Sequence, residues 1–179
     1  DCGFNLFLCA NNHIFDKGKS GLERTLDIYR SLASSHGIHF TGAAGDRDEF
    51  RRTTPLVLNI KGIRAAFINV TYGTNSPRGE GWPMVNILKD RPMLEAALLE
   101  AEEKADISIV LVHWGEEYVT RHSQRQEDDA EWLAGQGADV IIGAHPHVIQ
   151  DTDTLEIEGR NVPVAYSIGN CISSMSAVN

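Results

Sequence analysis

The sequence predicts an α/β domain in which helices are layered on a mixed β-sheet. Short apolar runs typical of buried strands alternate along the chain with segments whose apolar residues recur at helical spacing. Two of these runs flank Lys61-Gly62, as the strands of a β-hairpin do. The length of 179 residues suits one domain and no internal repeat divides it, so residues 1–179 are expected to form a single domain.

The first predicted elements are a strand, a helix and a second strand. Residues 4–9 form a short apolar run that predicts a buried strand. In the helix that follows, Ser20-Gly21-Leu22-Glu23 has the pattern of a capping box, and Gly37 is expected to end the helix. Residues 39–42 then predict another short strand.

The middle of the chain is predicted to hold the hairpin, a long loop and a helix. Residues 56–60 and 63–70 are the two strands of the hairpin. Residues 71–90 are rich in Gly, Pro, Asn and Ser, and a loop of that length in a compact domain is usually functional or disordered. Asp90 is expected to cap the next helix, with Pro92 in its first turn. The apolar face of this helix is formed by Leu94, Ala97, Leu98 and Ala101.

The last third predicts three strands and one helix. Residues 107–112 form a continuous apolar strand, and residues 124–136 a helix that Gly137 closes. The inward face of this helix is formed by Ala130, Leu133 and Ala134. Residues 139–142 and 162–168 are the remaining strands, the first of which Gly143 is expected to end.

Composition excludes several classes of function. Acidic residues outnumber basic ones by 25 to 16, which argues against a nucleic-acid partner, although a bound cation can still attract an anionic substrate. The apolar runs are far too short to span a membrane. Cys2, Cys9 and Cys171 have no C-x-x-C spacing and are expected to be buried or incidental thiols. The chain has neither an initiator Met nor a signal-peptide pattern, and we expect it to be part of a longer protein.

Polar residues that can bind a metal or move a proton follow three of the predicted strands. They are Asn12-His13, His113 and the pair His145 and His147 around Pro146. In extended backbone the last two imidazoles would point to the same side, where they suit one divalent ion or two adjacent ones. If the three strands are parallel neighbours, all these groups meet at one edge of the sheet.

Each of these residues also has a purely structural explanation. Asn12 is a common type of turn residue, and His113 beside Trp114-Gly115 could be a packed histidine at the edge of the core. Asp16 either accepts a hydrogen bond from the His13 ring or caps the loop. Glu116 and Glu117, close behind His113, are individually typical of solvated charges. The shared position after strand ends is what favours a functional site.

The motifs of this chain resemble those of CapA-type proteins, named for capsule and poly-γ-glutamate synthesis and related to calcineurin-like metallophosphoesterases. The first matching segment, residues 10–18, has the pattern A-N-N-H-x-x-D-x-G. The other matching segments are residues 71–75, 113–118, 143–148 and 166–170. These motifs span nearly the whole chain in the expected order.

The resemblance implies a layered α/β/β/α metallophosphatase-like sandwich with mixed sheets, incomplete in this chain, around a dinuclear metal site. The implied ligands of two divalent ions, which could be Mn, Zn or Fe, are Asn12, His113, His145 and His147. His13 would be a proton donor or a contact to the transition state, with Asp16 as its orienting residue. The implied substrate-cleft residues are Tyr72, Asn75, Glu116 and Glu117.

Some of the family's pattern is missing from this sequence. Its first metal-binding segments, a Gly-Asp and an Asn-Leu-Glu, should lie upstream of Asp1, so the N-terminally truncated chain is expected to bind metal weakly or not at all. The loss is also expected to leave a sheet edge unpaired. Cys171 stands where the family usually has Phe, and residues 119–123 lack an expected Pro, which puts the shape of these loops in doubt.

The resemblance implies a metal-dependent hydrolase associated with capsule or poly-γ-glutamate biosynthesis, with a phosphoester or a γ-glutamyl amide as substrate. The alternative is a non-catalytic, polymer-binding subunit of a capsule synthesis and export machine, and a weaker one is a 5′-nucleotidase-like phosphatase. Expected partners are an anionic polymer and other capsule-synthesis subunits, with no nucleic acid. The parent protein is expected to lie outside the cytoplasm, in association with the bacterial envelope.

Overall fold

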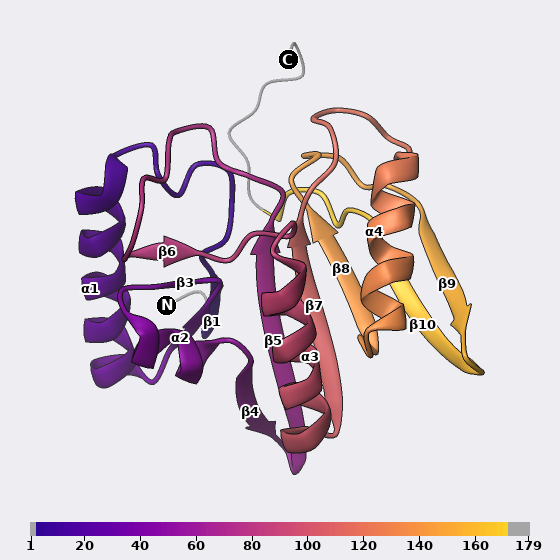
Figure 1. The fold of residues 1–179 in the computed structure, drawn as a ribbon, viewed down its shortest axis with the longest axis horizontal. Coiled ribbons are helices and arrows are strands. Elements are labelled where there is room, and N and C mark those ends of the chain that lie inside the picture. The colour runs from indigo at the N-terminus through magenta and orange to yellow at the C-terminus, as the bar shows by residue number, and fades with distance from the viewer. Residues whose placement is uncertain (1–2, 172–179) are drawn as a thin grey trace.

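The computed structural model describes residues 3–171, and its main feature is a six-stranded sheet (Figure 1). The strand order is β4-β5-β7-β8-β10-β9. The strands are β4 (Leu56–Ile60), β5 (Ile63–Thr71), β7 (Ile107–His113), β8 (Val140–Ala144), β9 (Thr152–Ile157) and β10 (Arg160–Ala165). The four central strands are parallel, whereas the two edge strands are antiparallel to their neighbours. The predicted α/β class with a mixed sheet is confirmed.

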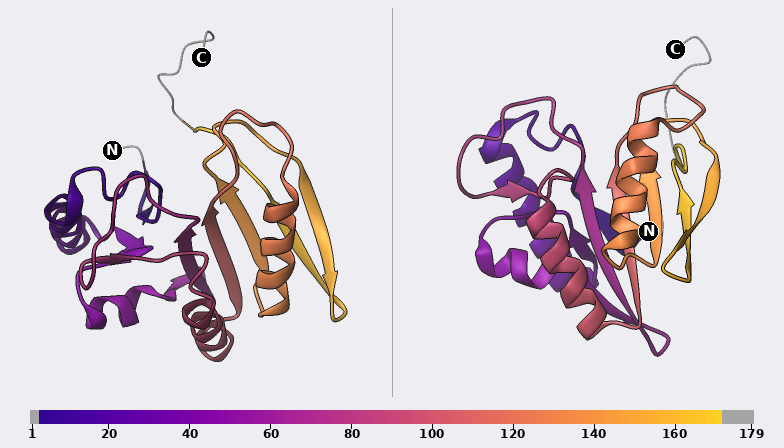
Figure 2. Two further views of the ribbon diagram at one scale, coloured as in Figure 1. Left: turned by 45° about the horizontal axis from the view of Figure 1, so that its top comes forward. Right: turned by 45° about the vertical axis from the view of Figure 1, so that its right-hand side comes forward.

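Two helices, α3 (Arg91–Lys104) and α4 (Gln124–Gly135), cover one face of this sheet (Figures 1 and 2). α3 connects the parallel neighbours β5 and β7, and α4 connects β7 and β8. Both connections move across the sheet in the same direction, and because such crossovers are right-handed, both helices lie on the same side. The helices bury the apolar faces that the sequence predicts, including Leu94 and Leu98 of α3 and Leu133 of α4. This layer holds the larger hydrophobic core.

A second group of elements lies beside the sheet, at the left of Figure 1. It comprises β1 (Leu6–Leu8), α1 (Gly18–His36), β2 (His39–Thr41), β3 (Ala43–Ala44), α2 (Arg47–Thr53) and β6 (Met84–Val85). β1 and β2 form a parallel pair, and β3 pairs with β6. Arg30 of α1 binds the buried Glu49 of α2 through two hydrogen bonds of 2.8 and 2.7 Å, which fixes the two helices together.

The side chain of Asn69 in β5 joins the second group to the main sheet. Its Oδ1 accepts from the Ala10 N–H at 2.7 Å, and its Nδ2 donates to the Leu111 carbonyl of β7 at 3.0 Å. Gly42 lies against this amide, because a Cβ at that position would approach Asn69 Oδ1 to 2.1 Å. β1 is therefore bonded to an amide and not to a neighbouring strand of the main sheet. The condition that the three site-bearing strands are parallel neighbours therefore holds for β7 and β8, whereas β1 pairs with β2.

Several predicted boundaries are wrong for physical reasons. α1 begins at Gly18, because the turn in which Gly18 N donates to Phe15 O leads directly into the helix, so Ser20 is not its cap. β8 continues through Gly143 to Ala144. Four elements were not predicted: β3 and β6 have only two residues each, α2 has seven, and β9 is an edge strand rich in polar residues.

The described cysteines, Cys9 and Cys171, are free thiols. Cys9 is buried, and burial together with the nearby Glu49 raises the pKa of this thiol to about 12. Cys171 is exposed, whereas Cys2 lies outside the described residues. Among residues 3–171, no helix combines the length and the apolar character needed to cross a membrane.

Candidate functional site

Asn12 and His113 meet although 101 positions separate them in the sequence. His113 is the last residue of β7, and Asn12 lies in the turn that follows β1. The His113 Nε2–H donates to Asn12 Oδ1 at 3.0 Å, and a buried amide held in this way has a defined orientation. Asn75 supports Asn12 from the other side, since its backbone N–H donates to the Asn12 carbonyl at 2.8 Å.

His145 packs beside His113, with 4.7 Å between the ring centroids. Its ring is almost fully buried and also lies 5.1 Å from the ring of Tyr72. The His147 ring is 6.2 Å from that of His145 and stacks on Tyr118 at 5.9 Å. Three imidazoles from the carboxyl ends of β7 and β8 therefore form one cluster, which we call the histidine cluster: His113, His145 and His147.

The backbone of the pair around Pro146 differs from the prediction. His145 and His147 have φ angles of 107° and 60°, so the loop after β8 is a turn in the left-handed region and not an extended segment. The two rings are consequently inclined by 55° to one another. The prediction that both imidazoles point to one side because of extended backbone is wrong, although the turn still leaves them within the same cluster.

The electrostatics of the cluster favour the neutral form of His113 and His145. Burial lowers the pKa of His113 to about 3, with a further lowering by His145, His147 and His13. The pKa of His145 is also lowered, mainly by burial, while the negative charge of Glu117 acts in the opposite direction. Neutral imidazoles have lone pairs and are the form in which histidine binds a metal.

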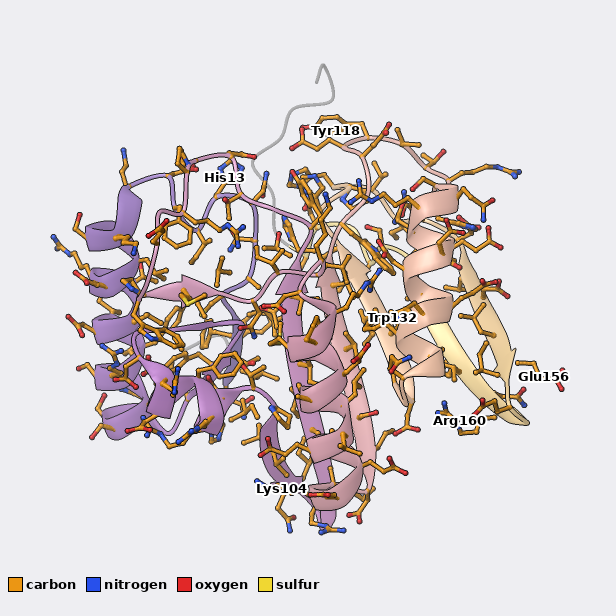
Figure 3. The ribbon with its side chains drawn as sticks, in the orientation of Figure 1. His13, Lys104, Tyr118, Trp132, Glu156 and Arg160 are labelled. Atoms are coloured by element: carbon orange, nitrogen blue, oxygen red, sulfur yellow. The ribbon has the colours of Figure 1, made fainter. Side chains whose placement is uncertain are left out.

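His13 and Asp16 form a separate, more exposed pair at the rim of the cluster. The His13 Nδ1–H donates to Asp16 Oδ2 at 2.7 Å, and the two side chains retain 62% and 43% of their exposure. This contact holds the ring so that Nε2 is left for a proton transfer. Figure 3 shows His13 at the same end of the molecule as Tyr118, beyond the carboxyl ends of the strands.

The four predicted substrate residues lie in different environments. Tyr72 contacts His145 and, with Glu116, lines a neighbouring cavity of about 250 Å³. Asn75 contacts Asn12 through its side chain as well, at 3.4 Å. Glu117 is exposed and close enough to influence His145 by its charge. Tyr72 and Glu117 therefore lie beside the histidine cluster, whereas Asn75 is connected to it through Asn12 and Glu116 lines the neighbouring cavity.

Three further residues contribute to the site but were not predicted to do so. Asn170 Oδ1 lies 2.8 Å from His147 Nδ1 and orients that ring, as second partners of histidine ligands do. Tyr118 stacks on the same ring, and Asn69 holds the backbone before Asn12. The sequence did contain a signal for Asn170. The pair Gly169-Asn170 follows the last predicted strand, just as the other site residues follow predicted strands.

The donor atoms of the cluster suit a metal ion, but the described residues do not by themselves complete a site. Imidazole nitrogens and an amide oxygen are chemically suitable ligands. Within residues 3–171, however, no group of three or more His, Cys, Asp or Glu side chains is arranged to hold a metal ion. The cluster also lacks a carboxylate ligand of the kind that hard divalent cations prefer.

Comparison with known proteins identifies the family. The family model described as "Bacterial capsule synthesis protein PGA_cap" matches residues 1–175. The chain belongs to the PGA_cap family. This membership confirms the resemblance to CapA-type proteins that the motifs indicate, and it covers every residue of the candidate site.

Relatives of this PGA_cap chain are larger proteins. It is 29% identical over 180 residues to the "Capsule biosynthesis protein CapA" of Bacillus anthracis, covering 96% of this chain and 41% of the relative. It is 28% identical to the "PGA biosynthesis protein CapA" of Bacillus subtilis (strain 168), covering 96% and 43%. A Mycobacterium tuberculosis relative, 26% identical, is named as a "Probable polyglutamine synthesis accessory protein" and is 45% covered. The chain spans less than half the length of these relatives.

A solved structure supports the fold. The chain matches the crystal structure of a hypothetical protein from Thermus thermophilus with a TM-score of 0.51 and 20% sequence identity. The match covers 93% of this chain and 54% of the other. At this identity the likeness supports the shared α/β architecture alone.

Proposed function

We propose that the full-length protein is a metal-dependent hydrolase of capsule or poly-γ-glutamate biosynthesis, with a γ-glutamyl amide or a phosphoester as its substrate. The observation that carries the proposal is the contact of 3.0 Å between Asn12 Oδ1 and His113 Nε2, with the His145 ring beside them. Residues this far apart in sequence converge beside two imidazoles of lowered pKa, and one of these, His145, is buried. Such a concentration of ligand groups at the carboxyl ends of parallel strands favours a functional site.

In this proposal Asn12, His113, His145 and His147 form one side of a divalent-metal site. Oxygen ligands from residues outside this chain complete it, because the described residues alone do not. Two ions of Mn, Zn or Fe are the candidates, and the ligand chemistry suits each of them. The metal then also explains how an acidic protein attracts an anionic polymer.

The proton-transfer role falls to His13. Asp16 orients the ring through Nδ1, so in the imidazolium form the Nε2–H can donate a proton to a leaving amine or alkoxide and leave the ring neutral. The residues proposed to contact the substrate lie near the cluster or in the neighbouring cavity: Tyr72, Asn75, Glu116 and Glu117. We further propose that the protein works at the cell envelope with other subunits of capsule synthesis.

Metal content of the full-length protein tests the ligand assignment. Wild type, His145→Ala and His147→Ala are loaded with Mn²⁺ or Zn²⁺, dialysed and measured by mass spectrometry for bound metal. The expected result is loss of at least one equivalent in both variants. His39→Ala, which replaces an exposed histidine of β2, is the matched control and should retain full metal content. Equal metal in all four proteins would refute the site.

Hydrolysis tests the role of His13 separately. His13→Asn should lower the rate on poly-γ-glutamate or a phosphodiester by about 100-fold or more, the usual contribution of a general acid, while metal content stays unchanged. A variant that keeps the wild-type rate would remove His13 from the mechanism.

The second candidate function is a non-catalytic subunit that binds the polymer. The absence of a complete metal-ligand group among residues 3–171 favours it, and so does the word "accessory" in the name of the mycobacterial relative. Full-length protein that binds poly-γ-glutamate in calorimetry but neither retains metal nor hydrolyses the polymer would support this function over the first.

A further inference from the structure

One cavity of the described chain lies away from the histidine cluster. It has a volume of about 650 Å³ and is formed by α2, the segment that includes β6, and the start of α3. These elements lie next to one another in Figures 1 and 2. The volume is in the range of pockets that bind small molecules in proteins. No residue of the proposed metal site lines it.

The cavity offers a ligand a largely apolar surface. Phe50 of α2 and Trp82 lie with their ring centroids 6.2 Å apart, and Met84 and Met93 line the cavity with them. Trp82 and Met84 keep 37% and 44% of their surface exposed. Large apolar side chains gathered around a concave surface mark a place where another molecule can be bound.

Positive charge surrounds this apolar surface. Arg47, Arg51, Arg78 and Lys89 all line the cavity and are exposed. Only Arg51 has an ion pair among the described residues, with the exposed Asp48 at 3.7 Å. The one carboxylate in the lining, Asp90, accepts a hydrogen bond from the Met93 N–H and caps α3. Four cations therefore face one cavity in a chain whose net charge is −9.

We propose that this cavity is a binding site for an amphipathic anion, a molecule with an alkyl or aryl body and a phosphate or carboxylate head. The guanidinium and ammonium groups attract and hydrogen-bond the head, and guanidinium groups suit both head types. The aromatic and methionine side chains bury the body. A purely polar anion would leave the apolar surface uncovered, and a neutral hydrocarbon would leave the cations unpaired. The proposal is independent of the function assigned to the histidine cluster.

Calorimetric titration of the full-length protein with four compounds tests both halves of the ligand. They are decyl phosphate and decanoate, each below its micelle concentration, decanol, and inorganic phosphate. Decyl phosphate should bind at least tenfold more tightly than decanol or inorganic phosphate. Shortening its chain should weaken binding by about fourfold for each methylene removed from the buried part. Comparison with decanoate reveals which head the cavity prefers.

Substitutions locate the binding. Arg47→Gln combined with Arg78→Gln should weaken decyl phosphate binding by about tenfold, at about threefold for each exposed cation. Trp82→Ala should also weaken decyl phosphate binding, because it removes apolar surface that contacts the alkyl chain. Arg24→Gln, an exposed cation of α1 outside the cavity, is the matched control and should bind like wild type. The titrations use protein freed of metal with EDTA, so that a phosphate ester bound at the proposed metal site does not contribute to the signal.

Several results would overturn the proposal. Inorganic phosphate or decanol binding as tightly as decyl phosphate would remove the need for an amphipathic ligand. If Arg24→Gln and the Arg47/Arg78 double variant lose affinity for decyl phosphate to the same extent, the loss reflects the net charge of the protein and not contacts within the cavity. Undiminished binding in both the double variant and Trp82→Ala would place the ligand elsewhere.

Discussion

Gly143 lies at a position of β8 where the molecule has no space for a side chain. A Cβ built there would lie 1.9 Å from the Tyr166 carbonyl oxygen and 2.3 Å from Trp114 Nε1. The cause is the hydrogen bond of 2.9 Å in which the buried Trp114 indole donates to that carbonyl across the strand. A glycine within a strand commonly marks such a close approach. The residue therefore supports the packing under the histidine cluster.

Gly143→Ala should lower the free energy of unfolding by about 2–3 kcal/mol, since the added methyl displaces either the indole or the strand. Urea denaturation followed by circular dichroism measures the change. Gly135→Ala in α4 is the matched control: its Cβ would meet nothing within 4 Å, so the better helix former should be neutral or stabilising by about 0.5 kcal/mol. Similar losses in both variants would contradict the role assigned to the close approach.

The sequence indicated which residues would come together, but not their geometry. Polar groups directly after apolar runs pointed to Asn12, His113 and His145, which do converge. The positive φ angles around Pro146 depend on contacts with distant segments, such as the hydrogen bond from Tyr118 N to Pro146 O, and no local pattern encodes these. The bridging role of Asn69 was equally invisible, because an asparagine in a strand has no pattern that distinguishes it from a packed polar residue.

At the scale of elements, α4 illustrates how local signals set a helix boundary. Ser123 accepts a hydrogen bond from the Gln126 N–H, and the Gln126 side chain bonds back to the Ser123 N–H, which completes a capping box. Gln126 also donates to Gln150 Oε1 at 2.9 Å, so the cap is connected to the segment before β9. The start of α4 thus holds the loop that follows the histidine cluster.

Ser123→Ala should destabilise the protein by about 1 kcal/mol, the usual cost of losing a helix cap. Thermal unfolding monitored by circular dichroism provides the measurement. Ser34→Ala, in the exposed part of α1, is the control and should change stability little, since alanine is the better helix former there. If the Ser123 variant melts like wild type, the cap does not limit the stability of α4.

Helices and strands were predicted correctly where the apolar pattern extends over many residues and a cap or turn residue marks the boundary. α3 has its predicted cap at Asp90 and its predicted buried face, and the hairpin of β4 and β5 has its predicted turn at Lys61-Gly62. β9 was missed because an edge strand needs only half of its residues to be apolar, and its sequence Thr-Asp-Thr-Leu-Glu-Ile has fewer. The separation of β1 from the main sheet depends on one amide and could not be read from pattern.

The whole molecule is sensitive to acid through carboxylates that are bonded in the folded state. Hydrogen bonds from the Arg64 side chain and backbone lower the pKa of Asp106, which lies between α3 and β7. The backbone hydrogen bond from Glu49 lowers the pKa of Asp46, the cap of α2. A carboxyl whose folded pKa is depressed adds stability above its unfolded pKa of about 3.9, and this stability is lost as the pH falls through the folded value.

Replacing Asp106 by Asn should therefore reduce the fall in unfolding free energy between about pH 4 and pH 2, because one of the titrating groups is gone. Denaturant titrations at several pH values measure the slope. Glu23→Gln is the control, since Glu23 is exposed on α1 and has no ion pair among the described residues. A slope that Asp106→Asn leaves unchanged would mean that the contact with Arg64 does not persist in solution.

The left-handed backbone at His145 and His147 carries a conformational cost. At φ angles of 107° and 60°, a side chain with a Cβ costs about 1 kcal/mol per residue, which glycine avoids. Selection for folding alone would therefore favour glycine at both positions. Two imidazoles occupy them instead, one of them buried. Residues in this region persist where the surrounding structure holds them, so His145→Gly or His147→Gly should relax the backbone of the turn while removing one imidazole from the cluster.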